Sequence, residues 1–133
     1  MIVVDAGVWV RSLVDADESG DACRVAMTAD PDWAAPSHAA LEVLRTIRRY
    51  ETAGLIKSTF AEACAESVGA AEVRYVGPEP WMLHATWQIR HNVSIYDAPY
   101  VVLARRFDAV LTTLDQRLSR AAMSLGVSVA VPQ

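Results

Sequence analysis

The stretch Val93–Leu118 reads VSIYDAPYVVLARRFDAVLTTLDQRL, and it decides the fold that we expect for this chain. It predicts an apolar helix with Asp97 on its first turn, a short buried strand over 108–112, and a second carboxylate, Asp115, just past that strand. Loops that leave the carboxyl ends of parallel strands converge on one crevice, so we expect Asp97 and Asp115 to share it. Packing should aim Asp97 toward that crevice, because the helix has an apolar stripe made of Tyr100, Val101, Leu103, Ala104 and Phe107.

The rest of the chain alternates short apolar runs with helical patterns. We expect further strands near residues 1–5, 33–35, 72–76 and 127–131, and helices over about 6–14, 18–29, 38–53, 59–68, 80–91 and 117–124. Ser37 is expected to cap one helix, and Ser58-Thr59 with Glu62 to form a capping box for the next. Pro99 should make the first turn near Asp97 irregular. This order predicts an α/β/α fold of three layers, with a central, mainly parallel sheet.

Composition predicts one cytoplasmic globular domain over residues 1–133. Hydrophobic residues make up 53% and charged residues 21% of the chain, which excludes global disorder. No run reaches the roughly 18 to 20 apolar residues that span a bilayer, so no membrane association is expected, and MIVVDAG lacks the basic region of a secretion signal. Cys23 and Cys64 are isolated in helical patterns and are expected to be reduced core residues.

The charge pattern leaves a polyanionic partner open. The net charge is −4, from 16 acids and 12 bases, and reserving four acids for a metal would leave 12 against 12. All bases except one lysine are arginines, which suit bidentate phosphate contacts. In the helix expected over 38–53, Leu41, Leu44 and Ile47 should form the buried stripe. Arg45 and Arg49 fall on the same side as Glu42, so they are either phosphate contacts or part of a solvated helix face.

Four carboxylates stand at strand ends or helix starts beside apolar runs: Asp5, Glu42, Asp97 and Asp115. Taken singly, Asp5 and Asp115 suit helix N-caps, and Asp97 suits a partner of the helix dipole. If the fold brings all four to one crevice, their mutual repulsion favours a cation that neutralises them. Carboxylate oxygens suit Mg²⁺ or Mn²⁺, and a water bound to such an ion can attack phosphorus in line. Thr113 can orient a ligand or a water through its hydroxyl.

The segments MIVVDAG, ALEVLRTIRR, YDAPYVVLARR and VLTTLDQRL follow one another along essentially the whole chain. Together they resemble the PIN-domain ribonucleases, and specifically the VapC toxins of bacterial toxin–antitoxin modules. The resemblance implies a Mg²⁺- or Mn²⁺-dependent endoribonuclease that hydrolyses RNA with a metal-activated water. It assigns Asp5, Glu42, Asp97 and Asp115 as the catalytic, metal-binding quartet and Thr113 as an accessory hydroxyl. It also implies a homodimer silenced by a VapB-like antitoxin, and the four tryptophans supply apolar surface for association.

One position departs from the family pattern. Members often carry a serine, threonine or asparagine two residues after the first aspartate, and this chain has Gly7 there. A catalytically impaired PIN-like module, acting only through its dimer or antitoxin contacts, is therefore the alternative function. A receiver-like phosphoacceptor fits less well, because it requires an acid pair after the first strand and a strand-end lysine, whereas Lys57 is the only lysine. The sequence does not specify which RNA would be cleaved.

Overall fold

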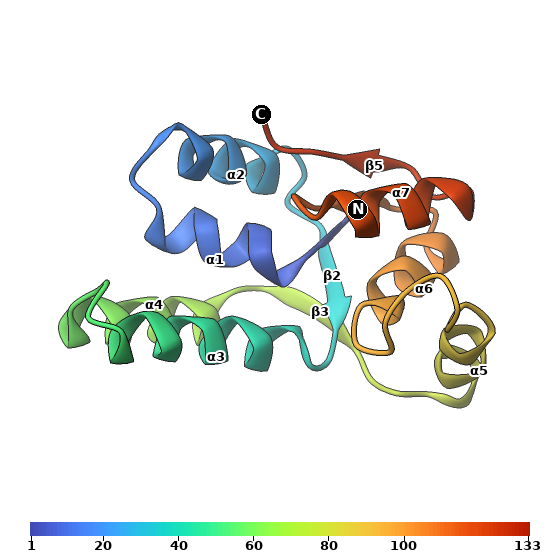
Figure 1. Ribbon diagram of the computed structural model, residues 1–133, viewed down its shortest axis with the longest axis horizontal. Coiled ribbons are helices and arrows are strands. Elements are labelled where there is room, and N and C mark those ends of the chain that lie inside the picture. Colours follow the sequence, from blue (N-terminus) through green and yellow to red (C-terminus); the bar gives the residue numbers. More distant parts are fainter.

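The computed structural model describes residues 1–133 and contains one five-stranded, wholly parallel sheet (Figure 1). The strand order is β3-β2-β1-β4-β5, which places the first strand at the centre. The strands are β1 (Ile2–Val4), β2 (Trp33–Pro36), β3 (Val73–Val76), β4 (Val110–Thr112) and β5 (Val129–Ala130). The helices are α1 (Ala6–Val14), α2 (Glu18–Thr28), α3 (Ala39–Thr52), α4 (Ser58–Ala70), α5 (Pro80–Gln88), α6 (Ala98–Arg106) and α7 (Gln116–Ser124). The α/β fold with a parallel sheet is confirmed.

Alternating side chains of β1 divide the core into two halves. Ile2 and Val4 join the cluster under α1, α2, α3 and α4, whereas Val3 joins the cluster under α5, α6 and α7. A strand covered on both faces needs apolar residues at every position, which explains the unbroken run at the N-terminus. Figure 1 shows the α3–α4 pair and the α5–α6 pair on different sides of the strands. The three layers therefore follow from one buried central strand.

The stretch that decides the fold forms the most deeply buried helix. In α6 the seven residues Ala98–Ala104 are all buried, and β4 pairs directly with β1. A run of turns over residues 95–97 precedes α6, so the expected irregular start near Asp97 is confirmed. Pro99 occupies one of the first two helical positions, where a missing N–H costs no intrahelical hydrogen bond. This start places Asp97 at the edge of the sheet and turns the rest of α6 into the core.

Two local predictions for α3 were wrong. Ser37 does not cap the helix, because its backbone N–H donates to the carbonyl of Val76 and extends the β2–β3 pairing by one residue. The helix begins at Ala39 instead, with His38 at the N-cap. Its buried side chains are Ala39, Val43 and Ile47, while the side chain of Leu41 is 68% exposed. Helix α3 therefore begins later than expected, and the side chains that it buries do not include Leu41.

The predicted capping box of α4 is also absent. Ser58 is the first helical residue, Lys57 is the N-cap, and no side chain caps this helix. The two cysteines are confirmed as free and buried. Gly54 and Gly126 have φ of 74° and 81° and end α3 and α7, as their positions predicted. No helix in the structure is long and apolar enough to cross a membrane.

Candidate active site

Three of the four carboxylates follow the adjacent strands β2, β1 and β4. Asp5 comes directly after β1, Glu42 is in the first turn of α3 after β2, and Asp115 comes shortly after β4. Asp97 reaches the same region as the N-cap residue of α6, which packs over these strands. The carboxyl ends of the three parallel strands lie side by side, so one edge of the sheet collects all four residues.

Asp5 is the most constrained of the four carboxylates. Its side chain is largely buried and forms no helix-capping hydrogen bond, so the simple N-cap role does not apply. The pKa of Asp5 is raised from 3.8 to about 6: burial raises it most, the hydrogen bond from Thr113 lowers it, and the charges of Asp97, Glu42 and Asp115 add to the rise. The other three carboxylates therefore act electrostatically on Asp5, as expected for acids that share one crevice.

Thr113 connects two of the acids. Its side chain is fully buried, and its Oγ1 donates to Asp5 Oδ2 at 2.8 Å. The same oxygen accepts a hydrogen bond from the backbone N–H of Asp115 at 3.0 Å. Asp115 in turn caps α7, because its Oδ1 accepts from the N–H groups of Arg117 and Leu118 at 2.9 and 3.1 Å. The prediction that Asp115 is a helix N-cap is thus confirmed. Its second oxygen, Oδ2, accepts no hydrogen bond.

Glu42 is held by a residue whose role the sequence did not reveal. The fully buried Tyr100 of α6 donates from its Oη to Glu42 Oε1 at 2.7 Å. Burial and the adjacent Glu42 raise the pKa of Tyr100, so the phenol stays protonated and remains a donor. His38 Nε2 lies 3.5 Å from the same Oε1 and 3.0 Å from the backbone oxygen of Tyr96. Helical spacing places Tyr100 one turn after Asp97 and His38 one turn before Glu42. This spacing indicates that both residues lie near the acids, but it does not indicate the contact between Tyr100 and Glu42.

Asp97 carries no side-chain hydrogen bond or ion pair. It lines a small cavity of about 160 Å³ together with Asp115 and Arg117. Arg45 and Arg49 project from α3 as exposed side chains that form no ion pairs and do not line this cavity. The structure therefore leaves both readings of these arginines open, and it adds Arg117 as a nearer cation.

The chemistry of the donor set fits a hard divalent cation. All four groups offer carboxylate oxygens, and none of them forms an ion pair with an arginine or a lysine. No three His, Cys, Asp or Glu side chains are arranged to hold a metal ion as they stand. Mg²⁺ takes only a few protein carboxylates and keeps several waters, so side-chain rotation and water ligands would complete such a site.

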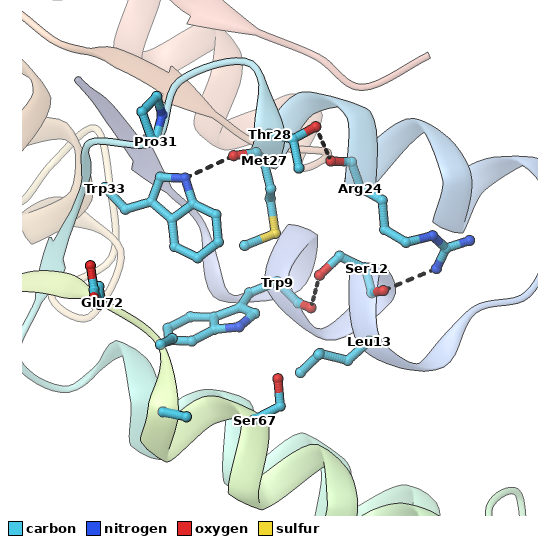
Figure 2. A pocket seen from close by; sticks show the side chains of 12 residues that line it. Trp9, Ser12, Leu13, Arg24, Met27, Thr28, Pro31, Trp33, Ser67 and Glu72 are labelled. Atoms are coloured by element: carbon cyan, nitrogen blue, oxygen red, sulfur yellow. Dashed lines mark hydrogen bonds between the residues drawn. The ribbon is translucent and has the colours of Figure 1, made fainter.

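A much larger hollow lies elsewhere (Figure 2). It has a volume of about 710 Å³ and is formed by α1, α2, the start of β2 and the end of α4. Figure 2 shows the indole rings of Trp9 and Trp33 on its walls with Met27 beside them. None of the four carboxylates lines it. We call this hollow the tryptophan groove.

Comparisons with known proteins agree with the fold. Residues 2–123 match the PIN domain family. Ribonuclease VapC3 of Mycobacterium tuberculosis is 33% identical over 120 residues, which cover 90% of this chain and 86% of that protein. The chain therefore belongs to the PIN-domain family, and within that family it is similar to the VapC proteins.

Solved structures support the same fold. The crystal structure of M. tuberculosis VapC20, a toxin that cleaves the sarcin–ricin loop, aligns with a TM-score of 0.70 at 19% identity over 91% of this chain and 95% of that one. A toxin–antitoxin complex from Klebsiella pneumoniae aligns with a TM-score of 0.73 at 12% identity, over 100% of this chain and 98% of the other. At these identities the alignments establish the architecture.

Proposed function

We propose that this protein is a Mg²⁺- or Mn²⁺-dependent endoribonuclease and the toxin of a type II toxin–antitoxin module. The observation that carries the proposal is Asp5, a largely buried acid whose pKa is raised to about 6 in part by Glu42, Asp97 and Asp115. A protein that needed these acids only for stability would not place four of them where they repel one another. The similarity to ribonuclease VapC3 over 90% of the chain supports RNA as the substrate.

The residues divide into those that bind and those that position. Asp5, Glu42, Asp97 and Asp115 would hold a divalent cation, which when bound activates water and offsets charge at the cleaved phosphate. Thr113 fixes the carboxylate of Asp5 and the backbone of Asp115 through two hydrogen bonds. Tyr100 fixes Glu42 in the same way. Because both supporting side chains are fully buried, the crevice is built on rigid elements and not on loops alone.

The decisive experiment is metal-dependent cleavage by the purified protein. We expect cleavage of single-stranded and structured RNA in Mg²⁺ or Mn²⁺ and none in EDTA, with activity restored by excess metal. Cleavage that persists in EDTA would exclude the metal mechanism. A protein that binds Mn²⁺ but cleaves no RNA from a broad panel would instead support the catalytically impaired module that Gly7 suggests.

We also propose two partners of this nuclease, a VapB-like antitoxin and a second copy of the chain. A solved neighbour is a toxin–antitoxin complex, which supports the first partner. Large apolar side chains on α5 support the second, since Leu83 and Trp87 are 55% and 57% exposed. Light scattering at tens of micromolar should give twice the chain mass, and co-expression with a VapB-like antitoxin should yield an inactive complex. A monomer mass would contradict the homodimer.

A further inference from the structure

A small cavity opens directly beside two of the four acids. Its volume is about 160 Å³, and Asp97 and Asp115 form part of its wall. Val93 and Leu118, both buried, contribute an apolar floor, and Asn92 and Arg117 bring polar groups from opposite elements. Pockets for drug-sized molecules measure roughly 300–1,000 Å³, so this one has room only for a fragment such as a single base or phosphate group.

Besides the two acids, three polar side chains line this cavity. Ser94 accepts a hydrogen bond from the backbone N–H of Asp97 at 3.3 Å, whereas the side chains of Asn92 and Arg117 are free to bind a ligand. Arg117 engages Asp115 only through its backbone N–H, and its guanidinium forms no ion pair with either acid of the wall. The only hydrogen bond that Asn92 forms in the connection from α5 to α6 is a backbone bond to Ile89. Asn92 and Arg117 are both exposed, so neither side chain is committed to the fold and both can turn toward a ligand in the cavity.

The charge and shape of the cavity suit a base better than a phosphate group. A second phosphate in the cavity would face Asp97 and Asp115 at close range, and it would leave the apolar floor of Val93 and Leu118 without a partner. A base is neutral, its face suits an apolar floor, and its edge can accept hydrogen bonds from an amide and a guanidinium. Single-stranded RNA is usually recognised through such splayed bases.

We infer that this cavity binds the base of one unpaired nucleotide next to the cleaved phosphate, and that Asn92 and Arg117 select a purine there. Both side chains are donors suited to the N7 position, which purines have and pyrimidines lack. The inference rests on the proposed function, because the neighbouring acids place the base beside the bond that is cut. Asn92 and Arg117 are thus residues of substrate specificity and not of catalysis.

Cleavage of a random single-stranded RNA pool in Mn²⁺, followed by sequencing of the new ends, tests this assignment. The parent should prefer a purine at one position flanking the cut, and Asn92→Ala or Arg117→Ala should weaken that preference by roughly five- to hundredfold, the range for one good base contact. Arg120→Ala is the matched control, because Arg120 is an exposed arginine of the same helix that does not line the cavity. It should leave the preference unchanged.

The outcomes separate the assignment from the proposed function. If Asn92→Ala and Arg117→Ala cleave all sequences more slowly but keep the purine preference, the base assignment is overturned and Arg117 is a phosphate contact. If the parent cleaves no RNA, the proposed function fails, and the cavity is tested by binding alone. For that, fluorescence anisotropy compares purine and pyrimidine hexanucleotides on Asp5→Asn, whose changed residue does not line the cavity. Equal affinity for the two, or a purine preference that Arg117→Ala does not reduce, would overturn the base assignment.

Discussion

The tryptophan groove and the carboxylate crevice differ in how their polar groups are satisfied. In the tryptophan groove the Trp33 Nε1 donates to the carbonyls of Met27 and Asp30, both at 2.8 Å. Arg24 donates to the carbonyls of Ser12 and Asp15 at 2.9 and 2.8 Å. At the carboxylate crevice, the side chain of Asp97 has no partner, and the pKa of Asp5 is raised by burial and by its acidic neighbours. The polar groups of the tryptophan groove are therefore satisfied within the protein, whereas the carboxylate crevice carries charge that calls for a ligand.

The largest effect should come from the crevice. Asp97→Asn removes one metal-binding charge without changing the size of the side chain, and we expect RNA cleavage to fall by roughly a thousandfold or more, since metal stabilisation of developing charge is worth several kcal/mol. Asp108→Asn is the matched control in the same stretch. Asp108 lies at the other end of α6 with φ of 50°, a conformation that asparagine also tolerates, so cleavage should not change. Full activity of Asp97→Asn would remove this residue from the mechanism.

The tryptophan groove should respond in stability and not in chemistry. Trp9 is buried in the cluster under α1 to α4, so Trp9→Ala should lower the free energy of unfolding by about 3–5 kcal/mol. Val25 on α2 is 70% exposed and is the control, and Val25→Ala should change stability by about 0.5 kcal/mol or less. Denaturant titration measures both. A cleavage rate per folded molecule that falls in Trp9→Ala would show that the two hollows are coupled.

Asp5 makes the stability of the crevice depend on pH. Its pKa rises from 3.8 to about 6 on folding, so its favourable contribution is complete below pH 4 and is lost as the pH rises through 6. In EDTA at pH 7.5, Asp5→Asn should therefore be more stable than the parent by on the order of 2–3 kcal/mol. The asparagine can still accept the hydrogen bond from Thr113. Mg²⁺ should reverse the order by stabilising only the parent, and equal unfolding midpoints at pH 5 and 7.5 would contradict the raised pKa.

Substitution of Asp115 by alanine should lower the stability, in contrast to substitution of Asp5, because Asp115 also caps α7. Asp115→Ala removes the oxygen that accepts from the N–H groups of Arg117 and Leu118, at a cost of about 1 kcal/mol. Thermal unfolding in EDTA measures this loss. Asp115→Asn keeps an acceptor oxygen and should retain most of the stability while losing cleavage. A stabilised Asp115→Ala would show that repulsion from the other acids outweighs the cap.

The sequence predicted the sheet edge well because strand ends are local features. The apolar runs around Asp5 and Asp115 fixed the strands, and the buried stripe of α6 fixed the helix that carries Asp97. The start of α3 was predicted poorly because it depends on the hydrogen bond from Ser37 to Val76, far along the chain on β3. The same limit hid the pairing of Tyr100 with Glu42, which are 58 residues apart. Local patterns place acids at an edge, but only the fold shows which donors hold them.

Gly7 offers the smallest and most specific change to the crevice. A Cβ at this position would lie 3.8 Å from Asp5 Oδ2, an ordinary contact, and the residue is exposed in the first turn of α1. Gly7→Ser should therefore raise stability by roughly 0.5 kcal/mol, because serine is a better helix residue than glycine. Gly7→Ala is the control that improves the helix without adding a hydroxyl.

Only the serine should act on the chemistry, by donating to Asp5 and lowering its pKa from about 6. The acid limb of the cleavage pH profile should then move to lower pH, and cleavage near pH 6 should rise by up to about tenfold, the lower end of what supporting hydrogen bonds contribute at metal sites. If Gly7→Ala and Gly7→Ser give the same profile, the hydroxyl plays no part. The departure from the family pattern at Gly7 would then matter only for the stability of α1, and the catalytically impaired alternative would lose its motivation.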